Sequence, residues 1–257
     1  MMKTYFTVLL CLLISLAKAQ TPDYSAYSYE QYVHNGDTLR YRMLTPLHYD
    51  IHKKYPLIVF LHGSGERGRD NAAQLTHGGA LFLQDSIREK YPAFVIFPQL
   101  PNDSTWGPFE RSGTGRMFPA DAPPTTPGRL VGELVDSLNK TGKIETKKVY
   151  LGGLSLGGMG TFDLLARYPN KWAAGFPICG AGAVENAKKF KSIPVWIFHG
   201  GADPVVPVQG SRNYYEALKQ LKAEVKYSEY PGVGHNSWDN AFAEPDLVPW
   251  LLSHKRK

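Results

Sequence analysis

Residues 149–160 read VYLGGLSLGGMG, and this stretch decides the fold class. The apolar run Val149–Leu151 is typical of a buried strand and a helix-like segment follows, so Ser155 falls at a strand-to-helix corner. Such a corner holds a serine in a sparsely populated backbone conformation. Gly153 and Gly157 let the strand and the helix approach closely, which larger side chains would obstruct. The stretch therefore predicts that Ser155 presents its hydroxyl as a nucleophile at the edge of a sheet.

Other continuous apolar runs in the chain resemble strands that are buried on both faces of a parallel sheet. They are Leu57–Leu61, Phe94–Phe97, Ala173–Ile178 and Val195–Phe198, and a final strand is predicted at Val225–Tyr230. Apolar helix faces lie between them, at Leu130–Leu138 and Tyr214–Leu221. The alternation predicts an α/β fold with a mostly parallel central sheet and helices on both faces. Thr38–Thr45 alternates apolar and polar residues, and we expect it to be an antiparallel edge strand.

The N-terminus has the layout of a cleavable secretory signal. A basic start, an apolar stretch over residues 5–16 and a small-residue ending at Ala19 are all present. We therefore expect residues 1–19 to be a signal peptide and residues 20–257 to form a single domain, secreted or periplasmic. No stable membrane association is expected after cleavage, and a retained membrane anchor is the alternative.

Charge and cysteine content narrow the class of protein. Cys11 would leave with the signal, so Cys179 remains alone and no intramolecular disulfide is expected. The formal net charge of +6 comes from scattered basic residues, apart from the tail 254–257, which suits a charged helix end. Nucleic-acid binding would need a basic stripe interleaved with aromatic residues, and the sequence has none. A weak preference for an acidic polymer stays open.

The segment Leu100–Gly128 departs from the alternation of strands and helices. It is rich in Pro, Gly, Thr and Asp and has no periodic apolar face, so we expect a long loop after a strand. Loops at the carboxyl ends of strands build the ligand crevice of open α/β sheets. We therefore expect Trp106 and Arg111 to bind substrate, with a surface loop of no such role as the alternative. Trp238 is expected to line the same pocket or to belong to the core.

A serine nucleophile needs a base within hydrogen-bond reach and an acid that orients this base. Among the eight histidines, His235 is favoured as the base because it lies in a Gly-rich loop directly after the last predicted strand. His199 ends a strand, where a buried structural role is expected. Asp203 is favoured as the acid because its Pro-bracketed loop at a strand end would hold the side chain in one place. Asp239 and Asp246 are the alternatives.

Acyl transfer also needs two backbone N–H groups that bind the negatively charged oxygen of the tetrahedral intermediate. One is expected on Leu156, which follows the nucleophile at a helix N-terminus. The other is expected in the Gly-rich segment after Leu57–Leu61, on Ser64 or, as second choice, on Gly65. His62 is expected to brace this segment. No cluster has metal-ligand spacing and no dinucleotide fingerprint is present, so we predict neither a metal nor a cofactor.

Taken together, these motifs resemble those of secreted α/β-hydrolase serine esterases. The matching motifs are FLHGSGERG at 60–68, GLSLGG at 153–158, PICG at 177–180, HG at 199–200 followed by Asp203, and YPGVGH at 230–235. From about Tyr55 onward, the chain is similar to the dienelactone hydrolase, polyhydroxybutyrate-depolymerase-like and phospholipase/carboxylesterase groups. The resemblance implies a catalytic triad of Ser155, Asp203 and His235 in that chain order. Dienelactone hydrolases themselves use a cysteine nucleophile, so their substrate is not carried over.

The residues and the resemblance together predict a serine esterase that hydrolyses carboxylic esters through an acyl-enzyme. Expected export and the aromatic and arginine residues of the long loop favour a small-molecule or polysaccharide ester, acetyl or feruloyl. Two alternatives stay open. One is a prolyl-oligopeptidase-like peptidase, because the same triad cleaves amides. The other is a catalytically inactive sugar-binding protein on the same fold.

Overall fold

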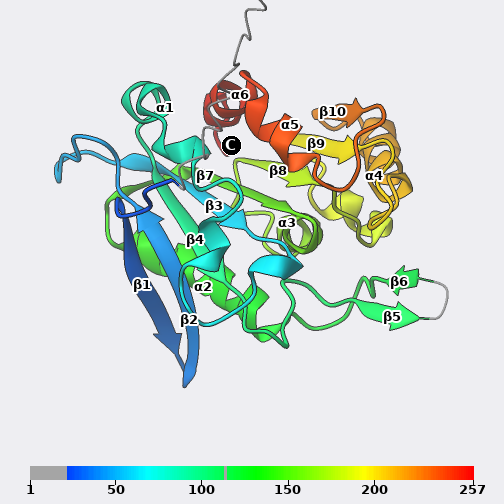
Figure 1. Ribbon diagram of the computed structural model, residues 1–257, viewed down its shortest axis with the longest axis horizontal. Coiled ribbons are helices and arrows are strands. Elements are labelled where there is room, and N and C mark those ends of the chain that lie inside the picture. Colours follow the sequence, from blue (N-terminus) through cyan, green and yellow to red (C-terminus); the bar gives the residue numbers. More distant parts are fainter. Residues whose placement is uncertain (1–21, 113–114) are drawn as a thin grey trace, which may run out of the picture.

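A computed structural model describes residues 22–112 and 115–257 and shows one large central sheet (Figure 1). Its strands are β1 (Tyr27–His34), β2 (Asp37–Leu44), β3 (Tyr55–Leu61), β4 (Phe94–Gln99), β7 (Ile144–Leu154), β8 (Ala174–Ile178), β9 (Val195–Gly200) and β10 (Val225–Tyr230). They lie in the order β1-β2-β4-β3-β7-β8-β9-β10. Strand β2 is antiparallel to both its neighbours, β1 and β4, and the other pairs are parallel. The predicted α/β fold is confirmed.

Helices cover both faces of this sheet. They are α1 (Asp85–Lys90), α2 (Thr126–Lys140), α3 (Leu156–Arg167), α4 (Gln209–Gln220), α5 (Trp238–Ala243) and α6 (Leu247–Ser253). Side chains of α2, α3 and α4 share one buried apolar cluster, whereas those of α5 and α6 share the other, on the opposite face. The apolar faces predicted at Leu130–Leu138 and Tyr214–Leu221 thus lie on α2 and α4, against the sheet.

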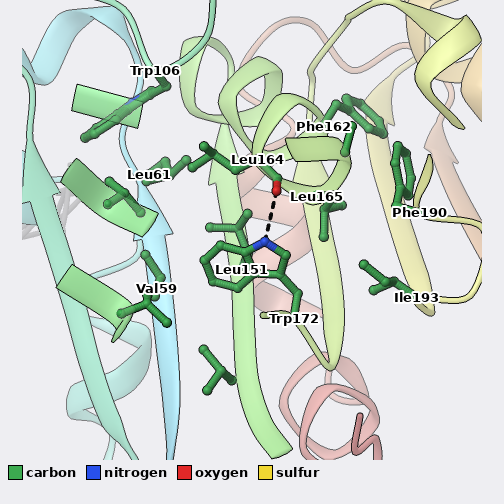
Figure 2. Close-up of a cluster of buried hydrophobic side chains, with 14 of the residues drawn as sticks. Val59, Leu61, Trp106, Leu151, Phe162, Leu164, Leu165, Trp172, Phe190 and Ile193 are labelled. Carbon is green, nitrogen blue, oxygen red and sulfur yellow. Dashed lines mark hydrogen bonds between the residues drawn. The ribbon is translucent and has the colours of Figure 1, made fainter. Parts of the chain in front are cut away.

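The continuous apolar runs follow from burial on both faces. Along β3, Leu57, Val59 and Leu61 enter the cluster under α2 and α3, while Ile58 and Phe60 enter the cluster under α6. Side chains of a strand point alternately to the two faces, so a strand covered on both sides needs an apolar residue at every position. Figure 2 shows Val59 and Leu61 of the first cluster beside Leu151 of β7.

The prediction that Thr38–Thr45 forms the edge of the sheet is wrong in one respect. The segment is the antiparallel strand β2, but β1 pairs along its whole length and forms the edge instead. The sequence of β1, YSYEQYVH, is polar because most of its side chains are exposed, including Tyr29 at 66% and Val33 at 56%. An exposed edge strand carries neither a continuous apolar run nor a regular alternation, so pattern analysis did not detect it.

The segment Leu100–Gly128 is also more structured than predicted. It contains a short hairpin of β5 (Glu110–Ser112) and β6 (Gly115–Met117), which Figure 1 shows extending away from the main sheet. Its last three residues belong to the start of α2. Thr125 caps that helix, because its hydroxyl oxygen accepts a hydrogen bond from the N–H of Gly128 at 3.2 Å.

No helix within residues 22–112 and 115–257 is long and apolar enough to cross a membrane. The expected signal peptide, residues 1–19, lies outside the described residues.

Candidate active site

Ser155 lies at the corner between β7 and α3 in a strained backbone conformation. Its φ of 53° and ψ of −115° are unusual for a residue with a Cβ atom. The neighbouring glycines explain how the corner closes: a Cβ atom on Gly157 would lie 1.9 Å from the carbonyl oxygen of Leu61, and one on Gly153 would lie 2.5 Å from that of Gly157. Strand and helix therefore meet backbone to backbone, as the spacing of the motif predicts.

Three loops bring the predicted polar side chains together at the carboxyl edge of the parallel strands. Ser155 follows β7, Asp203 follows β9 and His235 follows β10. The Nε2 atom of His235 lies 2.9 Å from the Oγ atom of Ser155, and its Nδ1 atom lies 2.7 Å from the Oδ2 atom of Asp203. A carboxylate only accepts hydrogen bonds, so Nδ1 carries the proton and Nε2 is free to accept from the serine hydroxyl.

Asp203 is held rigidly by its own loop. Its side chain is fully buried, and its Oδ1 atom accepts hydrogen bonds from the backbone N–H groups of Val205 at 2.8 Å and Val206 at 2.9 Å. Burial alone would raise the pKa of Asp203, but the hydrogen bonds from His235 and from these two N–H groups outweigh it and lower the pKa below its usual value. The carboxyl group is therefore ionised at neutral pH.

The alternative acids Asp239 and Asp246 are exposed and begin or precede the last two helices. Within the described residues, no hydrogen bond or ion pair joins either of them to His235. Of the three carboxylates considered from the sequence, Asp203 is the one placed to orient the histidine.

The loop after β3 lies against the serine. A Cβ atom on Gly63 would be 3.6 Å from the Cβ atom of Ser155, so the backbone of this loop flanks the corner. Ser64 is exposed and begins a short 3-10 turn, and Leu156 is the first residue of α3. N–H groups at the start of a helical turn have no partner within the turn, so those of Ser64 and Leu156 stay the predicted oxyanion donors.

His62 braces this loop from inside. It is 1% exposed, its Nε2 atom accepts from the N–H of Leu100 at 3.0 Å, and its Nδ1 atom donates to the carbonyl oxygen of Gly63 at 2.6 Å. Burial lowers the pKa of His62 to about 4, so the imidazole is neutral at physiological pH. The structural role expected from the sequence agrees with these contacts.

Acid should lower the free energy of unfolding, and protonation of His62 should account for part of this loss. Between its unfolded pKa of about 6.5 and its folded pKa of about 4, the unfolded chain binds the extra proton, so the free energy of unfolding should fall as pH decreases through this window. The loss attributable to this group is about 3 kcal/mol, and buried His199, whose pKa burial also lowers, acts in the same direction. Urea denaturation from pH 7 to pH 4 measures the slope. A His62→Asn variant, although less stable throughout, should show a shallower slope, and an unchanged slope would contradict this account.

The structure does not support substrate binding by Trp106, and it does not describe the side chain of Arg111. The prediction for Trp106 is wrong: its side chain is 0% exposed, donates its Nε1 proton to the carbonyl oxygen of His62 at 3.0 Å and packs beside Leu61 (Figure 2). A side chain without exposed surface cannot touch a substrate, so Trp106 supports the loop instead. Arg111 lies in β5, and the position of its side chain falls outside the described part of the structure.

Trp238 does lie at the site, partly exposed at the start of α5. Its ring meets the imidazole of His235 edge to face, with centroids 5.4 Å apart. On its other side it packs against His77 at 4.9 Å, and the Nε2 atom of His77 lies 3.5 Å from the Oε1 atom of Glu66. His77 was not predicted from the sequence, because nothing in its local pattern distinguishes it from a surface residue, and Glu66, although part of the motif at 60–68, was given no role of its own.

Cys179 is buried beside the triad, at the end of β8. Burial raises the pKa of its thiol to about 12, so the group stays protonated and unreactive at neutral pH. Cys179, Asp203 and His235 have ligand atoms within 4.8 Å of one another. Asp203 and His235 hydrogen-bond each other at 2.7 Å, so Cys179 lies beside an array that is already hydrogen-bonded.

The comparison with known proteins agrees with this geometry. Residues 48–244 match the phospholipase/carboxylesterase family, and they include all three side chains of the hydrogen-bonded array. The chain belongs to the phospholipase/carboxylesterase family. It is therefore an α/β hydrolase of a family of serine carboxylic ester hydrolases, as the sequence motifs predicted.

Individual proteins similar to this phospholipase/carboxylesterase family protein include esterases. It is 35% identical over 154 residues to a bifunctional acetylxylan esterase/xylanase of Neocallimastix patriciarum, in a match covering 60% of this chain and 20% of that protein. The crystal structure of a thermostable esterase has a TM-score of 0.83 and 33% identity, over 90% of this chain and 64% of the other.

A ferulic acid esterase from Anaeromyces mucronatus, solved in complex with ferulic acid, is more distant. It has a TM-score of 0.64 and 17% identity over 93% of this chain and 95% of the other, and so shares the fold. The chain spans about a fifth of the bifunctional relative and less than two thirds of the thermostable esterase.

Proposed function

We propose that this protein hydrolyses carboxylic esters with Ser155 as nucleophile, His235 as general base and Asp203 as the orienting acid. The single observation that supports this assignment is the continuous hydrogen-bonded array from Ser155 Oγ through His235 to Asp203 Oδ2, with distances of 2.9 and 2.7 Å. The first distance lies within the range in which a base can take the serine proton, and the second is that of a hydrogen bond that orients the base.

The proposed steps follow from this geometry. His235 takes the hydroxyl proton while Ser155 attacks the ester carbonyl, and the N–H groups of Leu156 and Ser64 hold the resulting oxyanion. His235 then gives its proton to the leaving alcohol. Water, activated by the same histidine, attacks the acyl-enzyme and releases the acid. Asp203 stays ionised and stabilises the transient imidazolium of His235.

We further propose that the ester is an acetyl or feruloyl ester of a polysaccharide. Support comes from similarity to the acetylxylan esterase/xylanase at 35% identity and from the fold shared with the ferulic acid esterase. Trp238, beside His235, offers an apolar wall for the substrate. The signal-like residues 1–19 support export of the mature chain, which N-terminal sequencing of secreted protein would test.

A substrate panel tests the ester class. Acetylated xylan, methyl ferulate and p-nitrophenyl esters of increasing acyl length should be compared by kcat/KM. We expect the highest values with acetylated xylan or methyl ferulate. A preference for long acyl chains over every sugar or aromatic ester would reject the polysaccharide assignment while leaving the serine mechanism intact.

Replacing Asp203 by asparagine should lower kcat by about 10⁴-fold. The N–H groups of Val205 and Val206 require an acceptor, so the amide oxygen will stay on them and the NH2 group will face His235. His235 must then carry its proton on the nitrogen that faces Ser155, where it cannot act as base. Ester hydrolysis under saturating substrate measures the loss. Asp239→Asn is the matched control and should keep full activity; a larger loss there than in Asp203→Asn would assign the acid differently.

A further inference from the structure

Asp203 contacts a second histidine that the proposed mechanism does not use. The Nε2 atom of His199 lies 3.2 Å from Oδ2 of Asp203, the same oxygen that accepts from His235. Like Asp203, His199 has a fully buried side chain. One carboxylate oxygen is thus shared between two imidazoles, one that faces the serine and one that faces the protein interior.

The hydrogen-bond partners of His199 determine which of its nitrogens carries the proton. Burial lowers its pKa, against opposing hydrogen bonds to Val206 and Asp203, so it is neutral at pH 7 and has one N–H group. Nε2 lies near two acceptors, Oδ2 of Asp203 and the carbonyl oxygen of Val206 at 3.0 Å, and must therefore be the donor. Nδ1, 2.7 Å from the hydroxyl of Ser211, has no proton of its own and so accepts the hydroxyl proton in preference to the carbonyl oxygen of Gly180, which lies farther away at 3.3 Å.

This arrangement fixes the orientation of the second imidazole. Ser211 is 0% exposed and belongs to α4, so its backbone position is fixed by the helix. Its hydrogen bond to Nδ1 then fixes the orientation of the His199 ring. Because the side chain of Asp203 has no exposed surface, no water competes for the N–H group of His199. A neutral donor on Oδ2 draws part of the negative charge away from His235 and prevents the carboxylate from turning.

We infer that His199 is a positioning residue for the reaction, which sets the orientation and the acceptor strength of the Asp203 carboxylate toward His235. The inference rests on the proposed function, because it requires Asp203 to act as the orienting acid. It goes beyond a purely structural role, because it predicts an effect on the pH dependence of the reaction as well as on stability.

The other ionisable groups around this array keep one charge over the useful pH range. Directly after β8, Cys179 stays neutral because burial raises its pKa to about 12. On β10, Glu229 stays ionised because its hydrogen bonds from Arg212 of α4 and Tyr227 lower its pKa to about 2. Neither of these two groups changes its charge in the range where ester hydrolysis is measured, so a change in the pH profile of the reaction would report on the contact between Asp203 and His235.

Two amide variants separate the contacts of Nε2, with Asp203 and the carbonyl oxygen of Val206, from the contact of Nδ1 with Ser211. The amide nitrogen of glutamine is as many bonds from Cβ as Nε2 of histidine, so His199→Gln can still donate to Asp203 but loses Ser211. The amide of asparagine reaches only the position of Nδ1, so His199→Asn keeps a partner in Ser211 but loses Asp203 and the carbonyl oxygen of Val206. Each variant thus keeps the contacts of one ring nitrogen and loses those of the other, and neither adds a charge, which makes them a matched pair.

In His199→Asn, we expect kcat for p-nitrophenyl acetate to fall about tenfold with little change in KM. The acid limb of kcat/KM should move to higher pH by about 0.3 to 1 unit, because the carboxylate then favours protonated His235 more strongly. In His199→Gln, both kcat and the position of the acid limb should return most of the way to the wild-type values. Rates are divided by the fraction of molecules that a fluorophosphonate labels, so that partial misfolding does not contribute. Equal rates and equal pH profiles in the two variants would overturn the inference.

A measurement on the wild-type protein keeps the inference testable if a variant does not fold. Nitrogen-15 NMR of the histidine side chains should show His199 neutral, with its proton on Nε2, across pH 6.5 to 9. A proton on Nδ1 would overturn the inference, because Nε2 would then have nothing to donate to Asp203. Failure of the proposed function would appear differently, as hydrolysis that persists when Ser155 is replaced.

Discussion

Replacing Ser155 with alanine should lower kcat for ester hydrolysis by about 10⁶-fold, the loss seen when a triad nucleophile is removed. His235 would keep its hydrogen bond to Asp203, but no side chain at this corner could then form the acyl-enzyme. Cys179 cannot substitute, because its thiol is buried and protonated at neutral pH. Residual hydrolysis would come only from water held near the oxyanion donors.

The measurement combines activity with labelling and folding. Fluorophosphonate should modify the wild-type protein on Ser155 and should not modify Ser155→Ala, while thermal unfolding should show a folded variant. Ser192→Ala is a suitable control, because Ser192 is exposed in the turn before β9, at the opposite end of the strands from Ser155. Full activity in Ser155→Ala would reject the mechanism, and labelling at another residue would identify the true nucleophile.

The parallel part of the fold could be predicted because it is buried on both faces. Strands β3, β4, β8 and β9 have mostly buried side chains on both sides, and their sequences are therefore almost wholly apolar. Strand β1 is exposed at the sheet edge, so its residues are constrained mainly by backbone pairing with β2, which no side-chain pattern reports. Burial on both faces leaves a clear signal in sequence, whereas backbone pairing at an exposed edge leaves little.

The same distinction applies to the candidate site. Ser155, Asp203 and His235 follow strands whose carboxyl ends had to meet at one edge, so their proximity could be predicted from topology. Trp106 lies in a Pro- and Gly-rich segment whose path depends on tertiary packing, and its burial against His62 could not be read from that segment. His199 was expected to have a structural role because it lies at the end of a strand. Its contact with Asp203 depends on the conformation of the loop that follows β9, which the sequence pattern does not specify.

The largest effect on stability should come from Gly157→Ala, which tests how tightly α3 approaches β3. The added Cβ atom would lie 1.9 Å from the carbonyl oxygen of Leu61 and 2.7 Å from that of His62. Both neighbours are backbone atoms of a central strand and of the loop that follows it, so no side chain can rotate away, and helix and sheet must separate. We expect the free energy of unfolding to fall by about 4 kcal/mol or more, the range reached when a core is overpacked without relief. Urea denaturation of purified protein measures it.

Gly65→Ala is the matched control, because a Cβ atom at Gly65 has no neighbour within 4 Å and its backbone is not in the left-handed region. This change should alter the free energy of unfolding by about 1 kcal/mol at most, in either direction, since it restricts the unfolded chain and adds no contact. A loss in Gly157→Ala no larger than in Gly65→Ala would mean that the helix can move off the sheet at little cost. The strained φ of Ser155 would then need another source, because close packing at Gly157 is what forces the chain to turn so sharply there.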